Sequence, residues 1–191
     1  MSKKNSPVYL ASGSPRRAEI LTKYGVEFQV IANLLDPEPM VKSGSLVYIR
    51  KQLRQLAFQK ADASKQAYQG VVIGADTVVV LDGQVLGKPD SIDQAVSMLK
   101  QLSGKTHVVV SSVCLLNTPS QTKTCISDVA EISFYALEEA QIREYCETHS
   151  VLDKAGGYAI QDIGHLFVKG YMGSYETIVG LPIHKMTALI K

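Results

Sequence analysis

A run of ten mostly apolar residues, Val71 to Val80, contains a single carboxylate, Asp76. A run this apolar predicts a buried strand of a sheet. An ionised carboxylate in such a strand is costly unless a cation, a metal or hydrogen-bond donors meet it. Gly74, just ahead of it, allows a backbone or a ligand to approach closely. Asp76 is therefore the first candidate for chemistry.

One cation follows soon after the predicted strand. The sequence Leu81-Asp82-Gly83-Gln84 contains an Asp-Gly pair, which is typical of the turn of a β-hairpin. The hairpin brings Gly87-Lys88-Pro89 back toward the strand that carries Asp76. Lys88 is therefore one candidate partner for this carboxylate.

The sequence Ser12-Gly13-Ser14-Pro15-Arg16-Arg17 follows a short predicted strand, Val8 to Ala11. Its Ser-Pro pair is typical of a helix start, with serine at the N-cap and proline at the first helical position. Arg16 and Arg17 then fall in the first turn, where a helix favours acidic side chains. Two arginines there suit a bound phosphate, which would also meet free backbone N–H groups. A capped helix with solvated arginines is the alternative.

Two further segments carry charges that suit this chemistry. Asp36-Pro37-Glu38-Pro39 predicts a rigid acidic loop, whose carboxylates either bind a metal, orient a substrate or serve solubility. Apolar residues at helical spacing predict an amphipathic helix from Leu46 to about Tyr68. Lys60 lies within this helix and is either a surface charge or a phosphate ligand.

The elements that must position these groups alternate between helical and strand patterns, which favours the α/β class. Further strands are predicted over 28–31, 106–116 and 124–134, and helices over 91–102 and 138–148. The segment 153–161, with two glycines behind a charged pair, predicts a loop shaped around a ligand and then a short strand. We find no repeat or linker, so a single domain spanning residues 1–191 is expected.

Composition excludes several classes of protein. The net charge of the 191 residues is +2, which gives no electrostatic basis for a nucleic-acid-binding protein. No apolar run approaches the length of a transmembrane helix, and the N-terminus does not resemble a signal peptide, so we expect a cytoplasmic protein without a membrane partner. The three cysteines are far apart, so we expect reduced thiols, and the four histidines lack the spacing of a metal site.

Six motifs together resemble the Maf family of nucleoside triphosphate pyrophosphatases. They appear in the family's order and span nearly the whole chain: Ser12 to Arg17, Gly74 to Val79, Gly87 to Pro89, Leu102 to Gly104 with His107, Asp153 to Gln161, and Val179 to Pro182. The resemblance implies an elongated α/β fold of the inosine-triphosphatase type. In that fold a mixed sheet with flanking helices forms two lobes around a cleft. It also implies a cytoplasmic enzyme that can form a homodimer.

The resemblance also implies an activity, a cofactor and site residues. The activity is hydrolysis of a nucleoside triphosphate to its monophosphate and pyrophosphate, with a divalent cation, Mg²⁺ or Mn²⁺. Asp76 corresponds to the catalytic carboxylate and to a metal ligand. Ser12, Arg16, Arg17, Lys60 and Lys88 correspond to phosphate ligands. Arg16, Thr77 and Gln161 match the branch that acts on dTTP and UTP.

One departure from the family pattern leaves two alternatives. The family commonly has adjacent acids in the loop after the second strand, whereas here Asp36 is followed by Pro37 and then Glu38. Either Glu38 takes the role of the second acid as a metal ligand, or the metal site is weaker. The alternative function is a non-catalytic module that senses a nucleotide in the control of cell division or septum formation.

Overall fold

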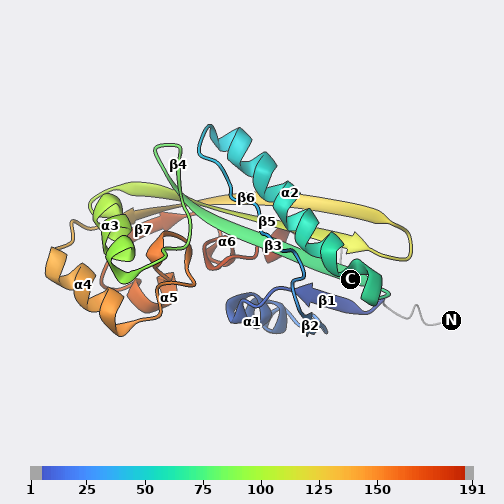
Figure 1. The fold of residues 1–191 in the computed structure, drawn as a ribbon. Helices are drawn as coiled ribbons and strands as arrows, with labels where there is room; N and C mark the ends of the chain where they lie inside the picture. The colour runs from blue at the N-terminus through green and yellow to red at the C-terminus, as the bar shows by residue number, and fades with distance from the viewer. Residues whose placement is uncertain (1–5, 188–191) are drawn as a thin grey trace.

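The computed structural model of the chain describes residues 6–187 and contains a seven-stranded mixed sheet flanked by helices (Figure 1). The strands are β1 Val8–Ala11, β2 Gln29–Ile31, β3 Val71–Leu81, β4 Gln84–Leu86, β5 Thr106–Asn117, β6 Thr122–Phe134 and β7 Val168–Met172. The α-helices are α1 Pro15–Lys23, α2 Leu46–Ser64, α3 Ile92–Leu102, α4 Glu139–Thr148, α5 Ile160–Ile163 and α6 Tyr175–Val179. Short 3₁₀ turns cover Lys65–Ala67, Ala155–Gly157 and Ile183–Lys185.

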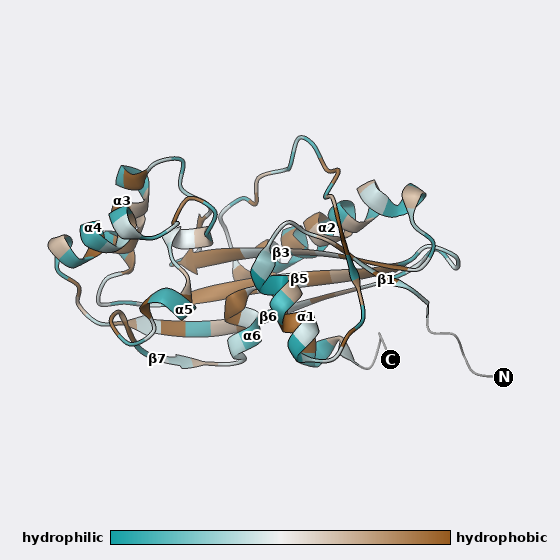
Figure 2. Cartoon of the chain, turned by 90° about the horizontal axis from the view of Figure 1, so that it is seen from below, coloured by the Kyte–Doolittle hydropathy of each residue, from teal (hydrophilic) through white to brown (hydrophobic). Residues whose placement is uncertain are grey.

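The strand order is β2-β1-β3-β5-β6-β7, with β4 paired to β3 beside this path. Strand β1 runs parallel to β2 and β3, and every other pairing is antiparallel. The helices α3, α4 and α5 gather at one end of the long strands, α1 lies near their middle, and β1 lies toward the other end (Figures 1 and 2). The expected α/β class, with an elongated mixed sheet and flanking helices, is confirmed.

Strand β3 has an incomplete neighbour on one side. Pairing with β1 extends only as far as Ile73, and pairing with β4 begins only at Val79. Among residues 6–187, the five residues between them pair with β5 alone, so this edge of β3 is open. Because side chains alternate along a strand, an open edge lets groups from both faces of the sheet reach one cavity.

Helix α2 lies across one face of β3, β5 and β6 (Figure 1). Ser45 caps its first turn by accepting a hydrogen bond from the backbone N–H of Tyr48. Its buried residues Ile49 and Leu53 pack on Val78, Val80 and Val110 of the sheet. The helix therefore holds a fixed position above the centre of β3.

The approach of α2 to the sheet depends on Gly74. A Cβ atom at this position would lie 2.1 Å from the carbonyl oxygen of Ala57 and 2.7 Å from the backbone nitrogen of Ala61. Only a glycine fits between the strand and the helix backbone at these distances.

The apolar surfaces of the strands face the helices, while the outward faces of the helices are hydrophilic (Figure 2). One core cluster joins α3 and α4 to the sheet through residues such as Leu99, Ile132 and Ile142. A second joins α1 and β1 to the C-terminal segment through Leu21, Leu181 and others. Within residues 6–187, no helix is both long enough and apolar enough to cross a membrane.

Two sequence-based expectations were wrong. Residues 160–163 form the short helix α5 rather than a strand. Cys114 and Cys125 form a disulfide, although reduced thiols were expected. The hairpin of β5 and β6 places these two cysteines directly opposite each other, so their separation in sequence was misleading. Cys146 is buried and reduced, as expected.

Replacing Gly74 tests the contact between α2 and β3. Gly74→Ala should lower the free energy of unfolding by about 3 kcal/mol, because the added methyl group overlaps backbone atoms that cannot move independently. Urea denaturation measures the loss. Gly170→Ala in β7 is the matched control, since a Cβ atom there meets nothing within 4 Å. Equal stabilities of the two variants would contradict the account.

Candidate active site

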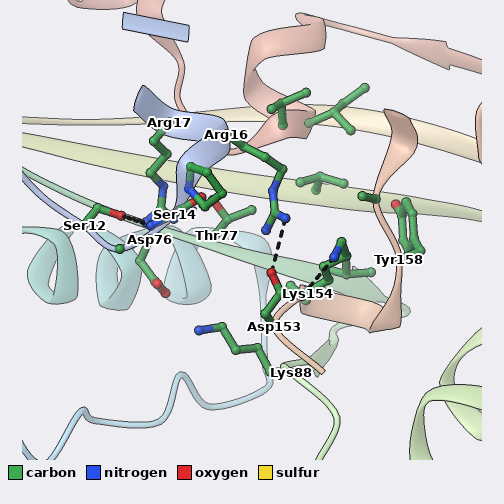
Figure 3. A pocket seen from close by; sticks show the side chains of 18 of the residues that line it. Ser12, Ser14, Arg16, Arg17, Asp76, Thr77, Lys88, Asp153, Lys154 and Tyr158 are labelled. Atoms are coloured by element: carbon green, nitrogen blue, oxygen red, sulfur yellow. Dashed lines mark hydrogen bonds and ion pairs between the residues drawn. The ribbon is translucent and has the colours of Figure 1, made fainter. Parts of the chain in front are cut away.

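A cavity of about 360 Å³ lies at the open edge of β3 (Figure 3). Four segments far apart in sequence line it: the loop after β1, the middle of β3, the turn after β4, and residues 153–161. Glu38 from the loop before α2, Lys60 of α2, Asn33, Val109 of β5, and Ile178 and Val179 of α6 also line the cavity. The site residues expected from the sequence are thus brought together, and Asp36 is the acid that does not line the cavity.

Two carboxylates converge on one ammonium group in this cavity. The Nζ atom of Lys60 lies 2.7 Å from Oδ1 of Asp76 and 2.8 Å from Oε1 of Glu38. Lys60 is buried, Asp76 is mostly buried and Glu38 is exposed. The carboxylate in the apolar strand therefore has its cation from α2, not from the hairpin. A buried pair of this kind is costly to break, because one partner would leave an unpaired charge.

This arrangement also answers which acid of the loop faces the site. Glu38, one position later than the family pattern, reaches the cavity. Lys60, expected to bind phosphate, is occupied by the two carboxylates.

The same donor set fits a divalent cation. Two carboxylate oxygens already converge on one positive centre, and hard cations such as Mg²⁺ prefer oxygen ligands. No cluster of three or more His, Cys, Asp or Glu side chains suited to a metal occurs within residues 6–187. The protein would therefore supply two ligands, and a substrate and water the rest, which is the usual pattern for Mg²⁺ bound with phosphates.

Arg17 enters the cavity from the first turn of α1 and is held by neutral acceptors. Its Nε donates to the carbonyl oxygen of Gly180 at 3.0 Å, and its Nη1 donates to Oγ of Ser12 at 2.9 Å. Its Nη2 donates to Oγ1 of Thr77 at 3.3 Å. Burial lowers the pKa of the guanidinium, and the charge of Asp76 opposes that shift. These bonds use three of its five N–H groups, so the orientation is fixed while donors remain for an anion.

Arg16 lies beside Arg17 and forms an ion pair with Asp153, at 3.4 Å from Nη1 to Oδ2 (Figure 3). Lys154, which is buried, contacts the same carboxylate at 2.9 Å. Burial raises the pKa of Asp153, but hydrogen bonds from Lys154 and Ser150 lower it by more. The pKa of this carboxyl group therefore lies below its ordinary value. Arg16 is thus tied to the segment on the far side of the cavity.

The start of α1 is left open toward the cavity. Ser14 occupies the N-cap position, but its side chain makes no capping hydrogen bond, and its backbone N–H donates to Oγ of Ser12. Pro15 follows at the first helical position. The helix therefore presents uncapped N–H groups next to two arginines, which is an arrangement suited to an anion.

Lys88 and Gln161 line the cavity with exposed side chains. Lys88 lies across from Arg17 (Figure 3), and a hydrogen bond from Gly156 to the carbonyl oxygen of Gly87 joins its turn to the glycine-rich segment. Gln161 is the second residue of α5. The hairpin therefore returns Lys88 to the site, as its turn sequence predicts.

Sequence reasoning missed Asp153, Lys154 and Tyr158 as individual lining residues. The segment that contains them was recognised as shaped around a ligand, but only Gln161 was assigned a role. The available signal was the charged pair ahead of two glycines, which now places Asp153 opposite Arg16.

Tyr158 is supported from behind by His107. The Nε2 atom of His107 lies 2.6 Å from the hydroxyl of Tyr158, and the imidazole packs edge-on against Phe134. Its Nδ1 atom is buried and has no hydrogen-bond partner among residues 6–187. Burial lowers the pKa of His107 from 6.5 to about 4 and raises that of Tyr158. His107 therefore supports Tyr158 as a neutral imidazole.

Comparison with known proteins gives consistent results. The family described as "Maf-like protein" matches residues 7–191. A dTTP/UTP pyrophosphatase of Clostridium perfringens (strain 13 / Type A) is 43% identical over 181 residues, covering 94% of this chain and 93% of the relative. One of Ruminiclostridium cellulolyticum is 36% identical over 185 residues, covering 96% and 94%.

Among solved structures, a dITP/XTP pyrophosphatase from Mycobacterium abscessus is 15% identical, with a TM-score of 0.46 and coverage of 96% of this chain and 94% of that one. This similarity is too low to carry an argument about fold or function.

The burial of His107 makes stability depend on pH. Because its folded-state pKa of about 4 lies below 6.5, the unfolded chain binds a proton between these values that the folded protein does not. The stability that depends on neutral His107 is complete above pH 6.5 and is lost as the pH falls toward 4. Urea denaturation of His107→Gln should therefore show a smaller loss of unfolding free energy from pH 7 to pH 5 than the parent.

The matched control is His165→Gln, because His165 is exposed. It should keep the parent's dependence on pH. An unchanged pH dependence in His107→Gln would show that this imidazole does not titrate below its ordinary range.

Proposed function

Because the chain belongs to the Maf family, we propose that it is a nucleoside triphosphate pyrophosphatase that hydrolyses dTTP and UTP to the monophosphate and pyrophosphate. One observation carries the proposal: Asp76 of β3 shares a cavity with Arg16 and Arg17 of α1 and with Lys88 of the turn after β4. The cavity thus combines the cations that a triphosphate needs with a carboxylate that can act on water.

The substrate's phosphates are bound by the cationic side of the cavity. Arg17 offers its remaining N–H groups, and the uncapped start of α1 adds backbone donors. Arg16, beside Arg17, and Lys88, across from Arg17, also bind the phosphates. Ser12 contributes indirectly, since its hydroxyl accepts from Arg17 and from the backbone of Ser14. Charge stabilisation of this kind supplies a large part of the acceleration in phosphoryl transfer.

The carboxylates of Asp76 and Glu38 act on the other side of the cavity. Asp76 accepts a proton from a water molecule, whose oxygen forms a bond to the α-phosphorus while the bond to the bridging oxygen breaks and pyrophosphate leaves. Glu38 and Asp76 would hold a Mg²⁺ or Mn²⁺ ion, which when bound neutralises charge on the phosphate oxygens. Lys60 balances the two carboxylates and keeps Asp76 in place.

The remaining assignments concern the base and the setting. Gln161 presents an amide with both donor and acceptor groups, which suits the edge of a pyrimidine. The family resemblance also supports a cytoplasmic homodimer as part of the proposal. No observation favours the alternative of a nucleotide sensor without turnover.

Replacing the catalytic carboxylate tests the proposed function. Asp76→Asn keeps the shape of the side chain but removes its charge, so the rate of pyrophosphate release from dTTP and UTP should fall by about 10³-fold or more. Asp82→Asn is the matched control, because Asp82 is exposed in the turn between β3 and β4 and has a positive φ that asparagine tolerates.

Pyrophosphate release is measured against a panel of nucleoside triphosphates, with dTTP and UTP expected to be turned over fastest. Parent-like turnover by Asp76→Asn would remove this residue from the mechanism. Tight nucleotide binding by the parent protein without any product would favour the sensor.

A further inference from the structure

A chain of hydroxyl groups extends behind Arg17, away from the cavity. Oγ1 of Thr77 lies 2.9 Å from Oγ of Ser111, which is fully buried in β5 and stands directly opposite Thr77 in the sheet. Oγ of Ser111 donates in turn to the carbonyl oxygen of Thr177 in α6, at 2.7 Å. Ser111 does not line the cavity. Ser111 belongs to none of the six sequence motifs.

The proton count fixes the direction of this chain. Each hydroxyl has one proton to donate. Since the proton of Ser111 goes to the carbonyl of Thr177, its oxygen accepts the proton of Thr77. The oxygen of Thr77 then presents lone pairs to Nη2 of Arg17. All three hydrogen bonds point away from the guanidinium, so each polarises the next.

The end of the chain is firmly anchored. The hydroxyl of Thr177 donates to Oδ2 of Asp128 at 2.6 Å, and α6 leads into Gly180, whose carbonyl oxygen accepts from Nε of Arg17. Gly180 has a φ of 118°, and a Cβ atom there would lie 3.2 Å from Oγ1 of Thr77. The backbone after α6 therefore fits closely around the threonine and the arginine.

We propose that Ser111 is a positioning residue, which makes Thr77 a fixed acceptor for Arg17 and so orients the guanidinium toward the phosphates. The proposal rests on the proposed function, in which Arg17 binds the triphosphate. It also changes the role expected for Thr77. Its proton is committed to Ser111, so this hydroxyl has none to donate to a pyrimidine base and acts through Arg17.

Ser111→Ala removes the acceptor for the proton of Thr77. The hydroxyl of Thr77 can then rotate and donate to the carbonyl oxygen of Gly180, 3.4 Å away. In that orientation its lone pairs no longer point at Nη2 of Arg17, and the hydrogen bond from Arg17 is weakened. We expect KM for dTTP and Kd for inorganic pyrophosphate each to rise about tenfold, the scale of one misaligned charge-assisted hydrogen bond. If Ser111→Ala only destabilised the fold, it would reduce the fraction of folded, active protein. The apparent kcat would then fall while KM stayed unchanged.

The control is Thr118→Val, just beyond the far end of β5. It also deletes one buried hydroxyl that donates to a backbone carbonyl, that of Tyr68 at 2.9 Å, but it has no connection to Arg17. KM and Kd should stay at the parent values even if stability falls.

A double-mutant cycle gives the decisive result. Thr77→Val should raise KM and Kd by itself, and adding Ser111→Ala should raise them no further, because both changes act through one contact. Additive effects, or a parent-like KM and Kd in Ser111→Ala, would overturn the proposal while leaving turnover by the parent intact. If the parent does not hydrolyse dTTP, the proposed function fails, and the Kd for pyrophosphate still decides the role of Ser111. A parent that neither hydrolyses dTTP nor binds pyrophosphate overturns both.

Discussion

Strand β3 lies inside the sheet, yet five of its residues have a neighbouring strand on one side only within the described part of the chain. This open edge is the constraint on which the site depends. Asp76 and Thr77 are adjacent and point to opposite faces, one toward α2 and the other toward α6. In a complete sheet they would belong to separate environments. At the open edge, both reach the same cavity.

The two faces contribute different chemistry. On the α2 side, the ammonium group of Lys60 holds two carboxylates together. On the α6 side, neutral acceptors hold the guanidinium of Arg17, and its charge is left for an anion. The two cations thus have opposite tasks: Lys60 balances protein carboxylates, and Arg17 faces the substrate. The difference follows from their partners and not from their charge.

Local features of the site could be predicted from the sequence. The Asp-Gly turn returned Lys88 to the cavity, and the Ser-Pro-Arg-Arg junction placed two arginines at a helix start, because neighbouring residues determine both structures. The order of the motifs predicted that Glu38 lies near the site, but it did not predict which residue pairs with Glu38. That partner, Lys60, is determined by how closely α2 approaches Gly74, which depends on packing across the sheet.

Features that depend on distant pairing escaped prediction for the same reason. No sequence pattern indicated a role for Ser111, because that role depends on its pairing with Thr77 between the neighbouring strands β3 and β5. The disulfide between Cys114 and Cys125 likewise depends on the register of a hairpin. The strand β7 is short and largely exposed, so its residues lack the apolar alternation that indicates a strand.

Hydrolysis of dTTP in ¹⁸O-labelled water tests the central claim most directly, namely that this cavity directs water to the α-phosphorus. The account predicts unlabelled pyrophosphate and one labelled oxygen in the thymidine monophosphate. Label in the pyrophosphate, or release of inorganic phosphate and a diphosphate, would contradict it, because water would then have attacked a different phosphorus atom.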